Sequence, residues 1–110
     1  MKSFGFAFKG LKAAWGERNF KLHLSATCVV VLLGYYIKIT TTEWLIIIVC
    51  IGLVISMELM NTAMEQLVDI VSPEFNEKAG KVKDVAAAAV LGMSIVALIV
   101  ALIIFLPYLL

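Results

Sequence analysis

The segment WLIIIVCIGLVISMELMNTAMEQLVD, from Trp44 to Asp69, says most about the structure of this chain. It carries no charge as far as Met57, and it then turns polar at i, i+3, i+4, i+7 and i+11, which is one face of a helix. The polar side chains on that face are Glu58, Asn61, Thr62, Glu65 and Asp69. Because ionisable groups are costly in a bilayer and usually functional there, the stretch predicts a membrane helix with a reactive polar end.

The overall composition indicates an integral membrane protein. The chain has 110 residues, of which 63% are hydrophobic and 15% charged, and its mean hydropathy is +1.04. These values lie well beyond those of soluble domains. The net charge is only +1, so no basic field suits a nucleic-acid partner. We therefore expect one membrane domain over residues 1–110, in which Cys28 and Cys50 are lipid-facing or packing residues.

Hydropathy predicts three transmembrane helices, each near or above the roughly 20 residues that a bilayer core requires. They cover about residues 22–39, 44–71 and 85–109. Ahead of them, apolar residues recur at i, i+4, i+7 and i+11, which indicates an amphipathic surface helix within residues 1–20. These apolar residues are Phe4, Phe8, Leu11 and Trp15. The fold class is thus an all-α membrane protein. A protomer of only three spans is too thin to enclose a polar site alone, so we expect a homo-oligomer with sites near subunit boundaries.

Lysine and arginine gather before the first span and between the second and third spans. The positive-inside rule therefore places the N-terminus and the second connection in the cytoplasm, and the C-terminus outside. The residues concerned are Lys2, Lys9, Lys12, Arg18, Lys21, Lys78, Lys81 and Lys83.

Two glutamates on the predicted span of residues 44–71 are suited to different roles. Glu58 and Glu65 are two turns apart, roughly 10 Å along the axis, which is too far for both to bind one ion directly. Glu58 lies deeper and suits a base for a lipid hydroxyl. Glu65 lies nearer the cytoplasm and suits Mg²⁺, with Asn61 between them to orient either group. Lys81 and Lys83, in the basic connection, offer counter-charges for a polyphosphate.

Several motifs together resemble those of the bacterial integral-membrane lipid kinases, the small diacylglycerol kinases and undecaprenol kinases. The motifs are Glu58-Leu59-Met60-Asn61-Thr62-Ala63-Met64-Glu65, Val68-Asp69, Lys83-Asp84, Phe8-Lys9-Gly10-Leu11 and Glu17-Arg18-Asn19-Phe20. The resemblance implies a multi-pass homotrimer in the bacterial plasma (inner) membrane, with composite sites at the cytoplasmic face. It also implies phosphorylation of a membrane lipid alcohol with ATP and Mg²⁺.

The same resemblance assigns roles to individual residues. Glu58 takes the place of the general base that activates the lipid hydroxyl, Glu17 and Glu65 match the acids that hold Mg²⁺ on ATP, and Asn61 matches the supporting amide. Nucleotide-contacting positions are matched by the segment from Glu74 to Asn76 and by Lys83 and Asp84. Phe6, Lys9 and Trp15 fall at positions where that family lines its lipid and nucleotide entrance.

Two features bear on the lipid. Ala87 stands where the diacylglycerol branch commonly has serine, and the stretch from Glu17 to His23 resembles the undecaprenol branch more closely. We therefore expect undecaprenol to be converted to undecaprenyl phosphate, with diacylglycerol to phosphatidic acid as the alternative. From another class, a small proton-coupled multidrug exporter also uses a membrane-embedded Glu, but it usually needs four spans. A purely structural subunit would leave the charged stripe unexplained.

Overall fold

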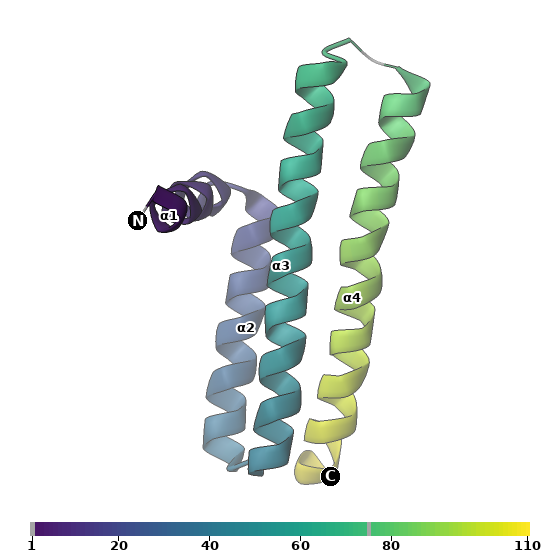
Figure 1. Cartoon of the computed structure of the whole chain (residues 1–110). Coiled ribbons are helices and arrows are strands. Elements are labelled where there is room, and N and C mark those ends of the chain that lie inside the picture. The colour runs from purple at the N-terminus through teal and green to yellow at the C-terminus, as the bar shows by residue number, and fades with distance from the viewer. Residues whose placement is uncertain (1, 75) are drawn as a thin grey trace.

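The structure is a computed structural model that describes residues 2–74 and 76–110, except for the side chain of Lys2. Helices make up almost all of it. The elements in chain order are α1 (Lys2–Trp15), α2 (Arg18–Ile37), α3 (Thr41–Val71) and α4 (Glu77–Leu109). Figure 1 shows α2, α3 and α4 running side by side, while α1 leaves the bundle at a steep angle. Within the described residues, α2, α3 and α4 are each long and apolar enough to cross a membrane. The prediction of an all-α membrane fold with three spans is confirmed.

The helices α3 and α4 are longer than a bilayer requires. They contain 31 and 33 residues, whereas α2 contains 20. At about 1.5 Å per residue, the roughly ten extra residues of each extend about 15 Å beyond the hydrocarbon. In Figure 1 the α3–α4 hairpin accordingly projects past the start of α2. Part of the polar sequence is therefore carried on rigid helix rather than on loops.

The short connection between α2 and α3 is closed by local signals in the sequence. Lys38 ends α2 in the left-handed conformation, with φ 65°. Thr40 and Glu43 then form a capping box, in which the Thr40 hydroxyl accepts from the Glu43 N–H and the Glu43 carboxylate accepts from the Thr40 N–H. At the same end the Tyr108 hydroxyl donates to the Glu43 carboxylate, so the end of α4 is joined to the start of α3.

The bundle has a small core at this end and little elsewhere. Ile39, Ile47, Ile104 and Phe105 form a buried cluster. In the most apolar stretch of each spanning helix, only 11–17% of the residues are buried within the chain. The remaining apolar surface faces outward, which suits contact with lipid or with further copies of the chain.

The corner between α1 and α2 sets the angle of the surface helix. The N–H of Glu17 donates to the carbonyl of Ala14 at 2.9 Å, and the rings of Trp15 and Phe20 pack with centroids 6.3 Å apart. The chain therefore leaves α1 at Trp15, and α2 begins at Arg18, within the region predicted as surface helix. Of residues 1–20, which were predicted as surface helix, residues 18–20 belong instead to α2, the first span. Met1 lies outside the described residues.

Candidate functional site

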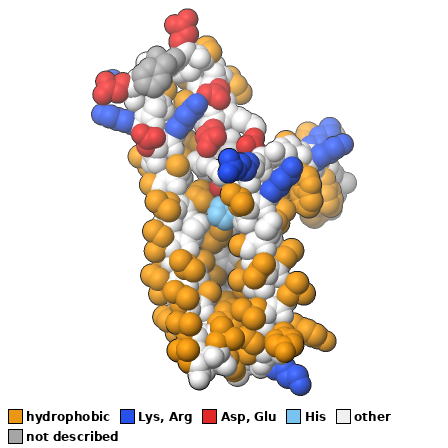
Figure 2. Space-filling view, turned by 180° about the vertical axis from the view of Figure 1, so that it is seen from behind, with side chains coloured by type: hydrophobic (Ala, Val, Ile, Leu, Met, Phe, Trp, Pro, Cys, Tyr) orange, Lys and Arg blue, Asp and Glu red, His pale blue; other side chains and the backbone are white. Residues whose placement is uncertain are grey.

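Charged side chains gather at the end of the bundle that carries the α3–α4 connection. Figure 2 shows this charged end above a mostly apolar body, with the histidine just beneath it. The chain has one histidine, His23 on α2. The sequence-predicted acids belong to this end, so the polar end of α3 and the starts of α2 and α4 define the candidate site.

The polar face of α3 passes from buried to exposed along its length. Glu58 and Asn61 are 3% and 6% exposed, whereas Glu65 is exposed. The Asn61 amide donates from Nδ2 to Glu65 Oε1 at 2.9 Å. The Thr62 hydroxyl donates to the backbone carbonyl of Glu58 at 3.0 Å. Glu58 is therefore the buried and Glu65 the exposed member of this face, while their roles as base and metal ligand stay predictions.

The buried Glu58 carboxylate is met by a side chain from another helix. His23 Nε2 lies 3.5 Å from Glu58 Oε2, and the two side chains are 21% and 4% exposed. From the sequence, His23 was assigned no role at the site, and this contact was missed. The available signal was a histidine within the first two turns of a membrane helix, at a depth where a polar side chain needs a partner.

Glu17 begins α2 and keeps its side chain available. It is the N-cap residue of α2, yet its carboxylate makes no capping hydrogen bond. Its side chain is exposed, so the carboxylate can meet a ligand.

The carboxylates fit a magnesium site of the kind that a bound nucleotide completes. Among the described residues, no three His, Cys, Asp or Glu side chains are grouped as a closed metal cage. Mg²⁺ usually takes only one or two protein carboxylates, with water and phosphate oxygens filling the octahedron. Glu17 and Glu65 are both exposed carboxylates, and beside Glu65 the Asn61 Oδ1 is buried without a partner in the described chain. This oxygen-only donor set suits Mg²⁺ better than a softer metal.

The start of α4 holds the predicted nucleotide contacts, but two of them have structural partners. Lys83 donates to Asp69 on α3 at 2.6 Å, and Asn76 caps α4 by accepting from the N–H groups of Lys78 and Ala79. Because Asn76 starts a helix, the basic segment expected to be a connection forms the first two turns of α4.

The other predicted contacts at this end are exposed. Glu74 and Asp84 both face solvent, and Phe75, within the predicted segment, lies outside the described residues. The predicted entrance residues Phe6, Lys9 and Trp15 are exposed on α1. Among the described side chains, none of the three forms a hydrogen bond or ion pair with the α3 acids. Their proposed roles therefore depend on bound ligands or further copies of the chain.

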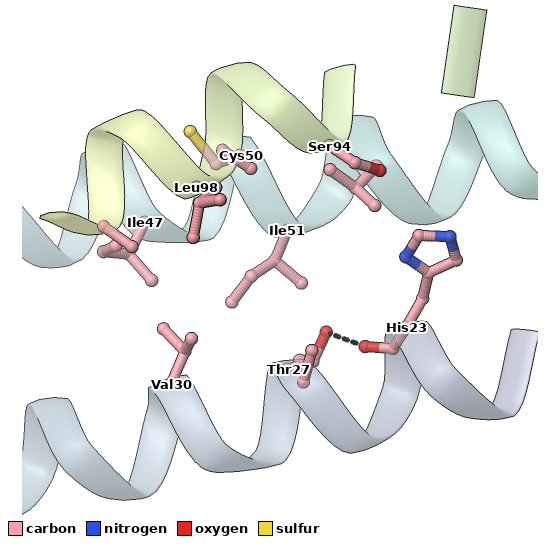
Figure 3. Close-up of a pocket in the computed structure, with 12 residues that line it drawn as sticks. His23, Thr27, Val30, Ile47, Cys50, Ile51, Ser94 and Leu98 are labelled. Carbon is pink, nitrogen blue, oxygen red and sulfur yellow. Dashed lines mark hydrogen bonds between the residues drawn. The ribbon is translucent and has the colours of Figure 1, made fainter. Parts of the chain in front are cut away.

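Below the acids, a cavity of about 210 Å³ opens between α2, α3 and α4. Figure 3 shows His23 pointing from α2 toward the other two helices, near Ser94 of α4, while the labelled residues farther along are mostly apolar. Thr27 also lines the cavity, with its hydroxyl donating to the His23 carbonyl at 2.8 Å. Ser94 Oγ is buried with no hydrogen-bond partner among the described residues. The cavity thus has one polar end and an apolar remainder.

Comparisons with known proteins agree with this arrangement. The family described as prokaryotic diacylglycerol kinase matches residues 5–105. The chain is 40% identical over 107 residues to the undecaprenol kinase of Bacillus subtilis (strain 168), covering 96% of this chain and 87% of that protein. It is 34% identical over 100 residues to the diacylglycerol kinase of Escherichia coli (strain K12), covering 90% and 82% respectively.

The matched region covers α2 and α3, α4 as far as Phe105 and nearly all of α1, together with every candidate site residue described above. The acid stripe, the charged end and nearly all of the three spanning helices therefore lie within the part of the chain that the family defines. By this match over most of its length, the protein belongs to the prokaryotic diacylglycerol kinase family, a family of multi-pass bacterial membrane lipid kinases.

Proposed function

We propose that this lipid kinase phosphorylates undecaprenol, using ATP and Mg²⁺ at the cytoplasmic face of the membrane. The observation that carries the proposal is the buried Glu58 carboxylate, two turns from the exposed Glu65 and next to His23 at the polar end of an apolar cavity. Such a site can meet a lipid hydroxyl from the membrane side and a phosphate from the water side. The choice of lipid is supported by the higher identity to a protein named undecaprenol kinase.

Glu58 would act as the general base. As the lipid oxygen forms its bond to the γ-phosphorus and the bond from that phosphorus to the ADP oxygen breaks, the hydroxyl proton passes to the Glu58 carboxylate. The burial of Glu58 excludes competing water from this step. Its position on a rigid helix fixes the carboxylate relative to the bilayer.

At the exposed end, Glu17 and Glu65 would hold Mg²⁺ together with the phosphates of ATP. When bound, the ion neutralises charge that develops on the phosphoryl oxygens. Asn61 orients Glu65 through the 2.9 Å hydrogen bond. Lys83 and Asp84, on the first turns of α4, are proposed to contact the nucleotide, and Lys83 would exchange Asp69 for a phosphate oxygen.

The lipid would enter laterally, with its hydroxyl at Glu58 and its first apolar carbons in the cavity between α2, α3 and α4. A hydrocarbon chain matches the mostly apolar lining. The thin protomer and its exposed apolar helices support a homo-oligomer, which would be the trimer that the family resemblance implies. The N-terminus would lie in the cytoplasm and the C-terminus outside, by the positive-inside rule. No observation favours the exporter, because the described residues contain three spanning helices rather than four and the family consists of lipid kinases.

The test is phosphate transfer from radiolabelled ATP to undecaprenol and to diacylglycerol, side by side, in mixed micelles with Mg²⁺. We expect a preference for undecaprenol and loss of transfer in Glu58→Gln, which keeps the shape of the side chain but removes the base. A preference for diacylglycerol would overturn the substrate assignment. Near-normal turnover of Glu58→Gln in a folded oligomer would overturn the role of Glu58.

A further inference from the structure

His23 has no step of its own in the proposed reaction, yet among the described residues its side chain lies against the Glu58 carboxylate. Its Nε2 atom lies 3.5 Å from Glu58 Oε2, across the boundary between α2 and α3. We propose that His23 is a positioning residue, which holds the Glu58 carboxylate in the orientation that receives the lipid hydroxyl. This inference rests on the proposed function of Glu58 as the base.

The first argument concerns burial. A carboxylate that is 4% exposed is stable only when a polar or charged group faces it, because an unpartnered buried charge carries a large desolvation penalty. Among the described residues, the ion-pair partner of Glu58 is His23, whose ring can offer an N–H or a positive charge at 3.5 Å. His23 is therefore the group that can stabilise the carboxylate directly.

The second argument concerns direction. His23 also lines the cavity between α2, α3 and α4, where it lies at the polar end near Ser94. A side chain that faces both the cavity and Glu58 can align the carboxylate with a hydroxyl entering from that cavity. The 3.5 Å separation exceeds the 2.7–3.2 Å of a formed hydrogen bond, and such contacts often tighten when the substrate binds.

The experiment compares His23→Leu with His23→Gln in the full-length protein in mixed micelles. Leu keeps much of the volume but removes the N–H, whereas Gln keeps a donor and removes the ring. We expect kcat to fall about 10- to 100-fold in His23→Leu, as misplacement of a reacting group causes, while KM for lipid and for ATP stays within about twofold. His23→Gln should recover most of this loss. Ser25→Ala, an exposed change on the same helix, is the control and should match the wild type.

A double-mutant cycle with Glu58→Gln separates positioning from an independent role. Because His23 would act only through the carboxylate, His23→Leu should lower the residual rate of Glu58→Gln by less than twofold. A normal kcat in His23→Leu, or additive losses in the double variant, would overturn the inference while leaving the kinase reaction intact. If His23→Leu does not fold, the test uses His23→Gln instead. A folded His23→Gln whose kcat lies more than about tenfold below that of the wild type would then overturn the inference. Absence of phosphate transfer by the wild type would instead overturn the proposed function itself, and this inference with it.

Discussion

Asn61 and Glu65 are joined along one turn of α3 by a hydrogen bond of 2.9 Å from the amide Nδ2 to the carboxylate Oε1. The bond links a residue that is 6% exposed to one that faces solvent. It leaves the Asn61 Oδ1 buried without a partner in the described chain and the second oxygen of Glu65 available to a ligand. The pair is thus arranged so that the buried amide fixes the direction in which the exposed carboxylate points.

Replacing Asn61 with Leu should weaken the use of Mg²⁺ more than it weakens the fold. Leu has a similar volume and leaves no buried polar group unsatisfied, so stability should change little. Loss of the orienting bond should raise the Mg²⁺ concentration for half-maximal activity by about tenfold, in the range seen when partners of metal ligands are removed. A Mg²⁺ titration of phosphate transfer measures this. Gln66→Ala, an exposed change beside Glu65, should leave the titration unchanged, and an unshifted curve for Asn61→Leu would contradict the orienting role.

Lys83 and Asp69 allow the nucleotide role of Lys83 to be separated from its ion pair. The two side chains are 39% and 65% exposed, so the pair should contribute only about 0.2–1 kcal/mol to stability. We expect Lys83→Met to raise KM for ATP several-fold. Asp69→Asn breaks the same pair but should leave KM for ATP equal or lower, because Lys83 is then free for phosphate. Equal increases in KM from both variants would show that the ion pair, rather than the lysine, matters.

Asn76 can be tested as a helix cap and as a nucleotide contact in one series. Its Oδ1 accepts from two backbone N–H groups at the start of α4. Asn76→Ala should therefore lower the free energy of unfolding by about 1 kcal/mol, whereas Asn76→Ser, which can still cap, should preserve most of it. Thermal unfolding in micelles measures both. A rise in KM for ATP in both variants would establish a nucleotide contact in addition to the cap, and unchanged stability in Asn76→Ala would contradict the capping role.

The three membrane spans and the residues of the polar face on α3 could be predicted from the sequence, because both follow from helical periodicity and hydropathy. Glu58, Asn61 and Glu65 could be placed on one stripe before any coordinates were known. The depth gradient along that stripe, from a buried Glu58 to an exposed Glu65, was also predictable from the apolar run that precedes it. These properties belong to a single helix and need no knowledge of its neighbours.

Contacts between helices were not predictable in the same way. The His23–Glu58 pair depends on the rotation of α2 against α3, and the Lys83–Asp69 pair depends on how α4 returns along α3. Periodicity within one helix does not fix either angle. The start of α4, in contrast, could have been predicted from the local sequence. Asn76 is a favoured N-cap residue and follows Pro73 by only three residues.

Gly34 should be sensitive to a single added methyl group, because the side chains of Ile39 and Trp44 lie close against it. A Cβ at this position would lie 3.0 Å from a ring carbon of Trp44 and 3.1 Å from the side chain of Ile39, tighter than most Cβ contacts in proteins. Gly34→Ala should therefore destabilise the protein by about 1–3 kcal/mol through overpacking, despite the better helix propensity of alanine. Gly52→Ala on α3, where a Cβ meets nothing within 4 Å of the same chain, is the matched control and should be neutral or slightly stabilising. Thermal unfolding of both variants decides the matter, and an unchanged midpoint for Gly34→Ala would mean that the Trp44 ring moves aside without cost.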